Sequence, residues 1–256
     1  MWPAEVDVDE LPACIAAPWP AVARVRAVTT VRSGGVSAAP FDTFNLGDHV
    51  GDDPAAVRAN RARLRTGLAL PAEPLWLTQV HGTRVVAAAE TQPGTEADGS
   101  FTDHAGVVCA VLTADCLPVF LCDRAATRVA VVHAGWRGLA AGVVEQGLAA
   151  MGVAGNQMLA WLGPAIGPQV FEVGDEVRQT FVSHQPEAVL AFQKNTRGRY
   201  YADIYALARL RLAAAGVTQV YGGEYCTYTE SQRFFSYRRD GQTGRMAALI
   251  WLDADA

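Results

Sequence analysis

The sequence lacks the long apolar runs of a membrane protein, although 50% of its 256 residues are hydrophobic. It contains no stretch of about 18 uncharged apolar residues, the length that a helix needs to cross a bilayer. The amino terminus has no basic region before its apolar residues and carries Glu5 and Asp7 instead, which is unlike a secretory signal. We therefore expect no membrane partner.

Cysteine and positive charge are scarce as well. The five cysteines are odd in number and dispersed between positions 14 and 226, which argues against a disulfide framework and favours a reducing compartment, the cytoplasm. Asp and Glu (26) outnumber Lys and Arg (21), and no basic cluster of the kind that binds nucleic acid is present. We expect no nucleic-acid partner and a monomer, whereas a small anion needs only one or two arginines.

Neither a repeat nor a nucleotide-binding glycine motif (GxGxxG or a Walker loop) is present. Hydrophobic patterns predict strands at 24–31, 75–80, 84–88, 107–112, 118–121, 129–132, 158–162 and 246–252. Helices are predicted after Asp53-Pro54, an acidic N-cap followed by proline, and at 139–150, 174–183 and 204–214. Because these elements do not alternate strictly, we expect an α+β fold with layered mixed β-sheets flanked by helices. We expect residues 1–22 to be a variable lead-in and residues 23–256 to form a single catalytic domain.

Three side chains with metal-binding chemistry, His81, Cys116 and His133, stand where predicted strands meet polar turns. Two imidazoles and one thiolate are the ligand set of a catalytic zinc site with an open fourth position. Their wide separation in sequence leaves two other interpretations open. They are ordinary polar residues at strand ends, or Cys116 is a nucleophile activated by His133, with Asp115 or another acceptor orienting the imidazole. A laccase-type copper cluster is excluded because it needs many more histidines than the five present.

Several polar residues are candidates to bind an anion or a nucleoside. Arg32 and Ser33 precede two glycines, and a guanidinium, a hydroxyl and backbone N–H groups would bind phosphate, although a plain glycine turn has the same pattern. Arg137 follows His133 by four residues at the start of a predicted helix, where the helix dipole favours an anion. Asn45 either hydrogen-bonds a ligand or stabilises a left-handed turn.

Two further segments have a simple interpretation. Residues 97–99 (ADG) are most simply a turn, and alternatively they place Asp98 to hold a metal-ligating histidine. Residues 234–240 (FFSYRRD) combine aromatic residues with arginines. We expect core packing and solvated charge there rather than a lid over a pocket.

Taken together, these segments resemble those of the YfiH-type, or laccase-domain, family. The matching segments are RSGGVS (32–37), FNLG (44–47), GDD (51–53), NR (60–61), QVHG (79–82), ADG (97–99), TADCLPV (113–119), HAGWRG (133–138), GPAIGP (163–168), FFSYRRD (234–240) and TGRMAALIW (243–251). They extend from the first predicted strand nearly to the carboxyl terminus. TADCLPV and HAGWRG at this separation are highly specific.

The resemblance implies a fold shared with the catalytic domain of cytotoxic-necrotizing-factor toxins, and a zinc ion, or alternatively copper, held by His81, Cys116 and His133. It implies phosphorolysis of adenosine, inosine and S-methyl-5′-thioadenosine to the free base and a ribose-1-phosphate, with adenosine deamination as a side activity. Copper-dependent phenol oxidation and the editing of peptidoglycan precursors are further activities described for relatives. The resemblance also implies that Cys116, His133 and Arg32 are catalytic. The residues expected to bind the purine nucleoside and phosphate are Arg32, Ser33, Asn45 and Arg137.

Overall fold

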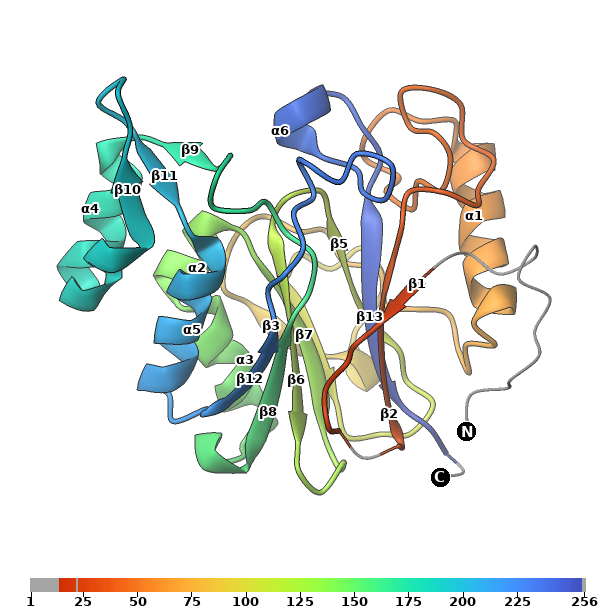
Figure 1. Ribbon diagram of the computed structural model, residues 1–256. Helices are drawn as coiled ribbons and strands as arrows, with labels where there is room; N and C mark the ends of the chain where they lie inside the picture. The colour runs from red at the N-terminus through yellow and green to blue at the C-terminus, as the bar shows by residue number, and fades with distance from the viewer. Residues whose placement is uncertain (1–13, 22, 255–256) are drawn as a thin grey trace.

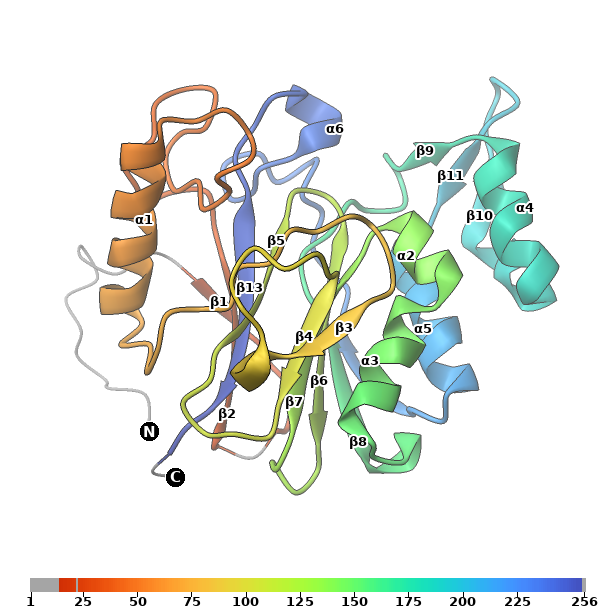
Figure 2. The same cartoon turned by 180° about the vertical axis from the view of Figure 1, so that it is seen from behind.

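Two β-sheets packed face to face form the centre of the computed structural model, which describes residues 14–21 and 23–254. Helix α1 (Pro54–Gly67) covers the outer face of one sheet. Helices α2 (Trp136–Ala141), α3 (Val143–Met151) and α5 (Ile204–Ala214) cover the outer face of the other (Figures 1 and 2). The layers therefore run helix, sheet, sheet, helix. This arrangement confirms the predicted α+β fold of layered sheets flanked by helices.

The smaller sheet is antiparallel throughout, with the strand order β1-β2-β13-β5. Its strands are β1 (Cys14–Ala16), β2 (Val25–Thr30), β13 (Met246–Leu252) and β5 (Cys109–Thr113). Strand β1 lies within the predicted lead-in, so residues 14–16 of that segment belong to the sheet. Residues 1–13 and 22 of the lead-in lie outside the described residues.

The larger sheet is mixed, with the strand order β12-β8-β6-β7-β4-β3. Its strands are β12 (Gln219–Gly222), β8 (Met158–Leu162), β6 (Leu117–Asp123), β7 (Val129–Ala134), β4 (Gly99–Thr102) and β3 (Val85–Ala87). The two outer pairs, β12–β8 and β4–β3, are parallel, whereas the inner pairs are antiparallel. The antiparallel pairing of β6 with β7 places the start of β6 beside the end of β7.

The strands at the centre are buried on both faces, which explains their apolar sequences. In β6, Phe120 and Cys122 pack between the two sheets, whereas Val119 and Leu121 pack against the helices. Strands covered on both sides appear in sequence as continuous apolar runs rather than as alternating patterns. For this reason the predicted strands at 107–112, 118–121, 129–132 and 246–252 agree with β5, β6, β7 and β13.

Helix α1 begins as predicted, because the Asp53 carboxylate accepts a hydrogen bond from the backbone N–H of Ala55 and Pro54 occupies the first turn. The prediction of one helix at 139–150 is wrong. Gly142 has a φ of 99°, ends α2, and leaves α3 to begin at the next residue. Glycine adopts this left-handed conformation without the steric cost that a side chain would add.

The predicted strand at 75–80 is also wrong. Leu75 and Thr78 form isolated bridges to two different partners, Cys109 and Glu96, so no continuous ladder develops. A small third sheet, unpredicted, lies beside helix α4. The remaining elements are β9 (Glu172–Val173), β10 (Phe192–Lys194), β11 (Tyr200–Ala202), α4 (Asp175–His184), α6 (Tyr237–Asp240) and the 3₁₀ helices η1 (Ala88–Glu90), η2 (Gly155–Gln157) and η3 (Pro186–Ala191). No helix in the described part of the chain combines the length and apolarity needed to span a membrane.

Candidate metal centre

Three side chains, His81, Cys116 and His133, come together beside the start of β6 and the end of β7, the two central strands of the larger sheet. His133 lies near the end of β7, opposite Pro118 of β6, and Cys116 immediately precedes β6. His81 comes from the loop before β3. The possible ligand atoms of the three side chains all lie within 4.8 Å of one another. Cys116 Sγ is 3.9 Å from His81 Nε2.

The chemistry and spacing of these donors suit a metal ion. With zinc–sulfur and zinc–nitrogen bonds of about 2.3 and 2.0 Å, tetrahedral coordination separates sulfur from nitrogen by about 3.5 Å. The observed sulfur–nitrogen distance of 3.9 Å is close to this value. A thiolate and two imidazoles suit zinc or copper, and three protein ligands leave a fourth position open. Within the described residues this is the single group of three or more side chains that could hold a metal.

A buried carboxylate contacts two of the three segments that supply these donors. Asp98 is fully buried, and its Oδ1 lies 2.9 Å from Nδ1 of His133. This contact leaves Nε2 of His133 for the cluster. The Asp98 carboxylate also accepts hydrogen bonds from the backbone N–H groups of Val80, His81 and Gly82, at 3.2, 2.9 and 2.6 Å. Of the two interpretations of residues 97–99, the structure therefore agrees with the placement of Asp98 beside a histidine of the cluster.

Two glycines of the HAGWRG segment allow the cluster to assemble. A Cβ at Gly135 would lie 2.9 Å from Cδ2 of His81 and 3.1 Å from Cys116 Sγ. A Cβ at Gly138 would lie 2.8 Å from the carbonyl oxygen of Gly82. All three distances are shorter than ordinary van der Waals contact. The close approach of the His81 loop to α2 therefore requires glycine at these positions.

Without a bound cation, the cluster favours a negatively charged Cys116 and a positively charged His133. Burial opposes ionisation of Cys116, but the charge and hydrogen bonds of His133 and His81 lower the pKa of this thiol to about 6. Burial likewise opposes protonation of His133, yet the Cys116 thiolate and the Asp98 carboxylate raise the pKa of its imidazole to about 9. At neutral pH Cys116 is therefore a thiolate, the form that binds metals and acts as a nucleophile.

A cavity of about 170 Å³ opens beside Cys116 and His81. Helices α2 and α6 supply much of its wall, and α6 lies beyond the amino-terminal end of β13 (Figure 1). The other polar and aromatic side chains that line it are Asp115, Trp136, Arg137, Phe171, Tyr237 and Arg238. Tyr237 is 61% exposed, although it lines a cavity. Residues 234–240 therefore contribute to the cavity wall, which the sequence-based interpretation of this segment missed.

One arginine of this cavity is available to bind an anion. Asp115 is the one carboxylate among the described lining residues, and both its oxygens accept hydrogen bonds, from the Thr227 hydroxyl at 2.6 Å and the Arg238 backbone N–H at 2.7 Å. The guanidinium of Arg137 lies 4.5 Å from the Trp136 ring centre and forms no ion pair with a carboxylate in the described part of the chain. It is free to bind a ligand oxyanion.

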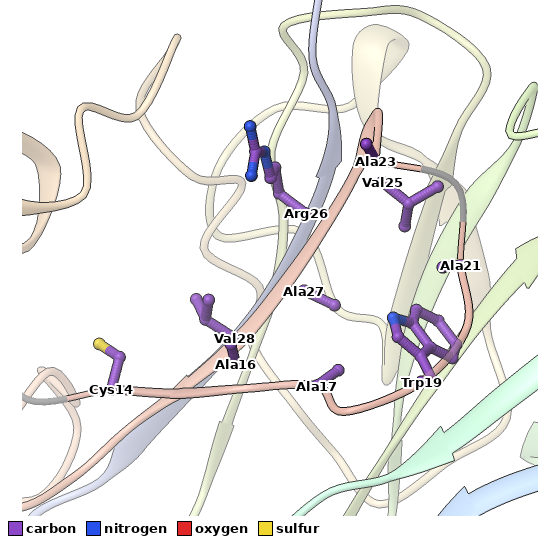
Figure 3. A pocket seen from close by; sticks show the side chains of 10 residues that line it. All are labelled: Cys14, Ala16, Ala17, Trp19, Ala21, Ala23, Val25, Arg26, Ala27 and Val28. Atoms are coloured by element: carbon purple, nitrogen blue, oxygen red, sulfur yellow. The ribbon is translucent and has the colours of Figure 1, made fainter. Parts of the chain in front are cut away.

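A larger cavity, of about 460 Å³, lies along β1 and β2 and has a different character (Figure 3). Its wall consists mainly of alanine and valine side chains with Trp19 at one end. Among the described residues, no histidine or carboxylate lines it. The chemistry-bearing side chains are therefore concentrated at the Cys116 cavity.

The structure does not bring Arg32 and Ser33 into the Cys116 cavity. Both line a separate hollow together with Asp42 and Ser231. The Arg32 guanidinium donates hydrogen bonds to the carbonyl oxygens of Asp42 and Ser231, at 3.1 and 3.0 Å, and pairs with the Asp42 carboxylate. Arg32 therefore connects two loops by hydrogen bonds. This geometry does not support its expected role in binding phosphate or in catalysis.

Asn45 is likewise placed as a structural residue. It is fully buried, its amide nitrogen donates to the Gly47 carbonyl and to Asp52, and its oxygen accepts from the N–H groups of Gly47 and Arg245. Asn60 closes the same network by donating to the Asn45 carbonyl. With its side chain fully engaged, Asn45 has no capacity left for a nucleoside.

Three residues near the cluster were absent from the sequence-based site. Tyr237 and Arg238 line the cavity, and Arg245 lies 5.8 Å from the Tyr237 ring centre. Burial lowers the pKa of the Arg245 guanidinium, and the nearby Cys116 thiolate opposes this shift. The available signals were the pairing of aromatic residues with arginines in FFSYRRD and the lone arginine in TGRM.

Comparison with known proteins places the chain in a family. The model of the family described as "Multi-copper polyphenol oxidoreductase laccase" matches residues 26–253. The chain belongs to this family. A purine nucleoside phosphorylase of Pseudomonas aeruginosa is 57% identical over 91% of this chain and 96% of its own length. The purine nucleoside phosphorylase YfiH of Escherichia coli is 52% identical over the same shares.

Solved structures of relatives have the same fold. A Neisseria meningitidis protein superimposes with a TM-score of 0.91 at 53% identity, covering 94% of this chain and 99% of its own. YlmD of Geobacillus stearothermophilus gives a TM-score of 0.86 at 36% identity, covering 91% and 94%. The predicted family is thus confirmed. Its descriptive name refers to several copper ions, whereas the described residues of this chain offer one three-ligand group.

Proposed function

We propose that this protein is a cytoplasmic, zinc-dependent purine nucleoside phosphorylase acting on adenosine, inosine and S-methyl-5′-thioadenosine, with adenosine deamination as a side activity. The observation that supports the proposal best is the group of His81, Cys116 and His133 beside a cavity lined by arginines. Relatives at 57% and 52% identity carry the name purine nucleoside phosphorylase. We propose zinc rather than copper because three ligands with an open position are typical of catalytic zinc sites.

In phosphorolysis a phosphate oxygen bonds to the ribose C1′ while the bond from C1′ to the purine nitrogen breaks. The base leaves with the bonding electron pair, and overall the proton of the phosphate ends on the base. When bound, zinc would supply Lewis-acid stabilisation of negative charge at the open position. The residues His81, Cys116 and His133 would hold it there.

The residues of the cavity supply binding and orientation. Arg137 would position the phosphate, and Arg238, whose Nη1 donates to the Glu172 carbonyl oxygen, would help to balance its charge. Together they replace the role first expected of Arg32. Tyr237 presents an exposed aromatic ring in the same cavity, on which a purine would stack. Fixing both reactants in one cavity converts a bimolecular encounter into an oriented reaction.

The test combines metal analysis of the protein as purified with an assay for ribose-1-phosphate from inosine and phosphate. The wild type should contain about one zinc per chain and form ribose-1-phosphate, and Cys116→Ala should lose both. Cys226→Ala is the matched control, because Cys226 is also half-buried but lies outside the group of three ligands. Full phosphorolysis by a zinc-free Cys116→Ala would contradict the metal-centred proposal.

A cysteine hydrolase is the second candidate, favoured by the approach of Asp98 to His133 and the lowered pKa of Cys116. In the metal-free protein, alkylation of Cys116 by iodoacetamide should rise through about pH 6 and level off at neutral pH, because the thiol pKa is about 6. A zinc-bound thiolate should resist alkylation until a chelator is added. Rapid alkylation of the zinc-loaded protein with loss of a hydrolytic activity would favour the second candidate.

A further inference from the structure

Asp98 occupies an unusual position between two of the three proposed ligands. It is fully buried immediately before β4. Its carboxylate lies 2.9 Å from Nδ1 of His133 and accepts hydrogen bonds from three consecutive backbone N–H groups of the His81 loop. Its backbone carbonyl also accepts the N–H of His133 at 2.7 Å. One residue thus contacts the segments of two ligands that are far apart in sequence.

We propose that Asp98 is a positioning residue that holds His81 and His133 as one unit and thereby sets the affinity and geometry of the metal site. A carboxylate behind a ligating histidine is a common arrangement. Here the same carboxylate also accepts hydrogen bonds from the backbone around His81. The inference rests on the metal-binding part of the proposed function, and it is independent of the purine chemistry.

The conformation of His81 supports this role. Its φ is 60°, a left-handed conformation that residues with a Cβ rarely adopt. The hydrogen bonds from Val80, His81 and Gly82 to one carboxylate stabilise that turn from one side. On the other side the Gly82 carbonyl packs against Gly138 of α2, where a Cβ would come within 2.8 Å. The loop is therefore confined between Asp98 and α2.

Charge is required as well as shape. An ionised carboxylate accepts all four hydrogen bonds, whereas an amide of the same size must direct N–H groups at some of these donors. Asp98→Asn therefore leaves at least one of these four N–H groups unpaired. The change acts on both histidines, so its effect on metal binding should exceed that of losing a contact to one of them.

The first experiment measures the zinc dissociation constant of the full chain by competition with a chromophoric chelator. We expect Asp98→Asn to raise this constant by about 10- to 100-fold. Asp123→Asn is the matched control, because Asp123 is also buried and accepts three hydrogen bonds, from Thr127 and Arg128, at the far end of β6. A constant within about threefold of the wild type in folded Asp98→Asn, or an equal loss in Asp123→Asn, would overturn the inference.

A spectroscopic measurement separates positioning from general destabilisation. In cobalt-substituted protein, Asp98→Asn should shift the d–d bands that report ligand geometry, and Asp123→Asn should leave them unchanged. If Asp98→Asn does not fold, nitrogen NMR of the zinc-loaded wild type with labelled histidine serves instead. A proton on Nδ1 of His133 and none on Nε2 is the expected result, and the reverse tautomer would contradict the inference.

The outcomes also distinguish this inference from the proposed function. A wild type that binds no zinc would refute the metal-dependent function itself. Tight zinc binding that is insensitive to Asp98→Asn would refute only the role of Asp98. Absence of ribose-1-phosphate would leave the zinc titrations and their interpretation unchanged.

Discussion

Two arginines that the sequence pattern assigns to phosphate binding lie in different places. Arg137 lies in the cavity beside Cys116, and Arg32 lines a separate hollow with its guanidinium engaged by Asp42 and Ser231. Arg137→Ala should therefore raise the phosphate KM by about 10- to 100-fold, since a hydrogen bond to a charged group contributes about 1.5–3 kcal/mol. Zinc content should not change. Initial rates at saturating inosine and varied phosphate measure the effect.

Arg32→Ala is the matched control for this prediction. It should leave the phosphate KM within about twofold of the wild type, because the side chain does not reach the cavity. It should instead lower the denaturation midpoint, because the loops that carry Asp42 and Ser231 lose their shared donor. A large rise in phosphate KM for Arg32→Ala, with none for Arg137→Ala, would reverse the assignment of the two arginines.

Residue chemistry alone made His81, Cys116 and His133 candidate metal ligands, because a thiol and two imidazoles form a known zinc ligand set. It left a nucleophile pair and ordinary polar residues at strand ends as alternatives, and the family resemblance favoured the metal site among them. Asn45 was not separable in this way, because an asparagine that caps a turn and one that binds a ligand look alike in sequence. Its role became visible only when all its hydrogen-bonding atoms had internal partners.

At the scale of elements, the break between α2 and α3 has a measurable consequence. Gly142 has a φ of 99°, and a Cβ there would also lie 3.4 Å from the Arg211 guanidinium and 3.5 Å from the Glu145 carboxylate. Gly142→Ala should therefore lower the free energy of unfolding by at least about 1–2 kcal/mol, the cost of the left-handed conformation for a residue with a Cβ. Urea denaturation followed by circular dichroism measures it.

Gly198→Ala provides the comparison for this variant. Gly198 has a φ of 76°, and a Cβ at this position would meet no packed neighbour within 4 Å, so its substitution adds backbone strain alone. Because a Cβ at Gly142 would meet Arg211 and Glu145 only at ordinary contact distances, the two variants should lose a similar free energy of unfolding. An unchanged or increased stability of Gly142→Ala would mean that the chain can run as one continuous helix here.

Elements buried on both faces were predictable, and those defined by tertiary pairing were not. The run at 246–252 is buried throughout and coincides with β13. The segment 75–80 has a strand-like composition, but its bridges go to two different partners. Strand β4 was missed because its sequence, GSFT, is neither apolar nor alternating and acquires its burial from β3 and β7.

At the scale of the whole molecule, the layered sheets form a rigid frame, and the segments at the start of β6 and the end of β7, with the His81 loop, carry the candidate metal ligands. The layers follow from the patterning, since sheets with two apolar faces require cover on each side. The juxtaposition of the His81 loop, the turn before β6 and the end of β7 depends on the order of strands in the larger sheet. That order involves pairings distant in sequence, which no local pattern encodes.

The same juxtaposition couples the metal to global stability. His81, Cys116 and His133 converge only in the folded chain, so zinc should bind the native state in preference to the unfolded state. At a free zinc concentration of about 100 times the dissociation constant, this preference adds about 2.7 kcal/mol. For a chain of this size the melting temperature should rise by roughly 5–10 °C, and excess chelator should reverse the rise.

Calorimetry of the chelator-treated protein with increasing zinc measures this coupling, with Cys116→Ala as the control. The control should show at most a small shift, because two imidazoles bind zinc more weakly than the complete set of ligands. A shift in Cys116→Ala as large as in the wild type would place the stabilising ion elsewhere on the chain. If saturating zinc did not raise the melting temperature of the wild type, the unfolded chain would bind the ion as well as the folded chain does. The arrangement of the three segments would then depend on the sheets and Asp98 alone.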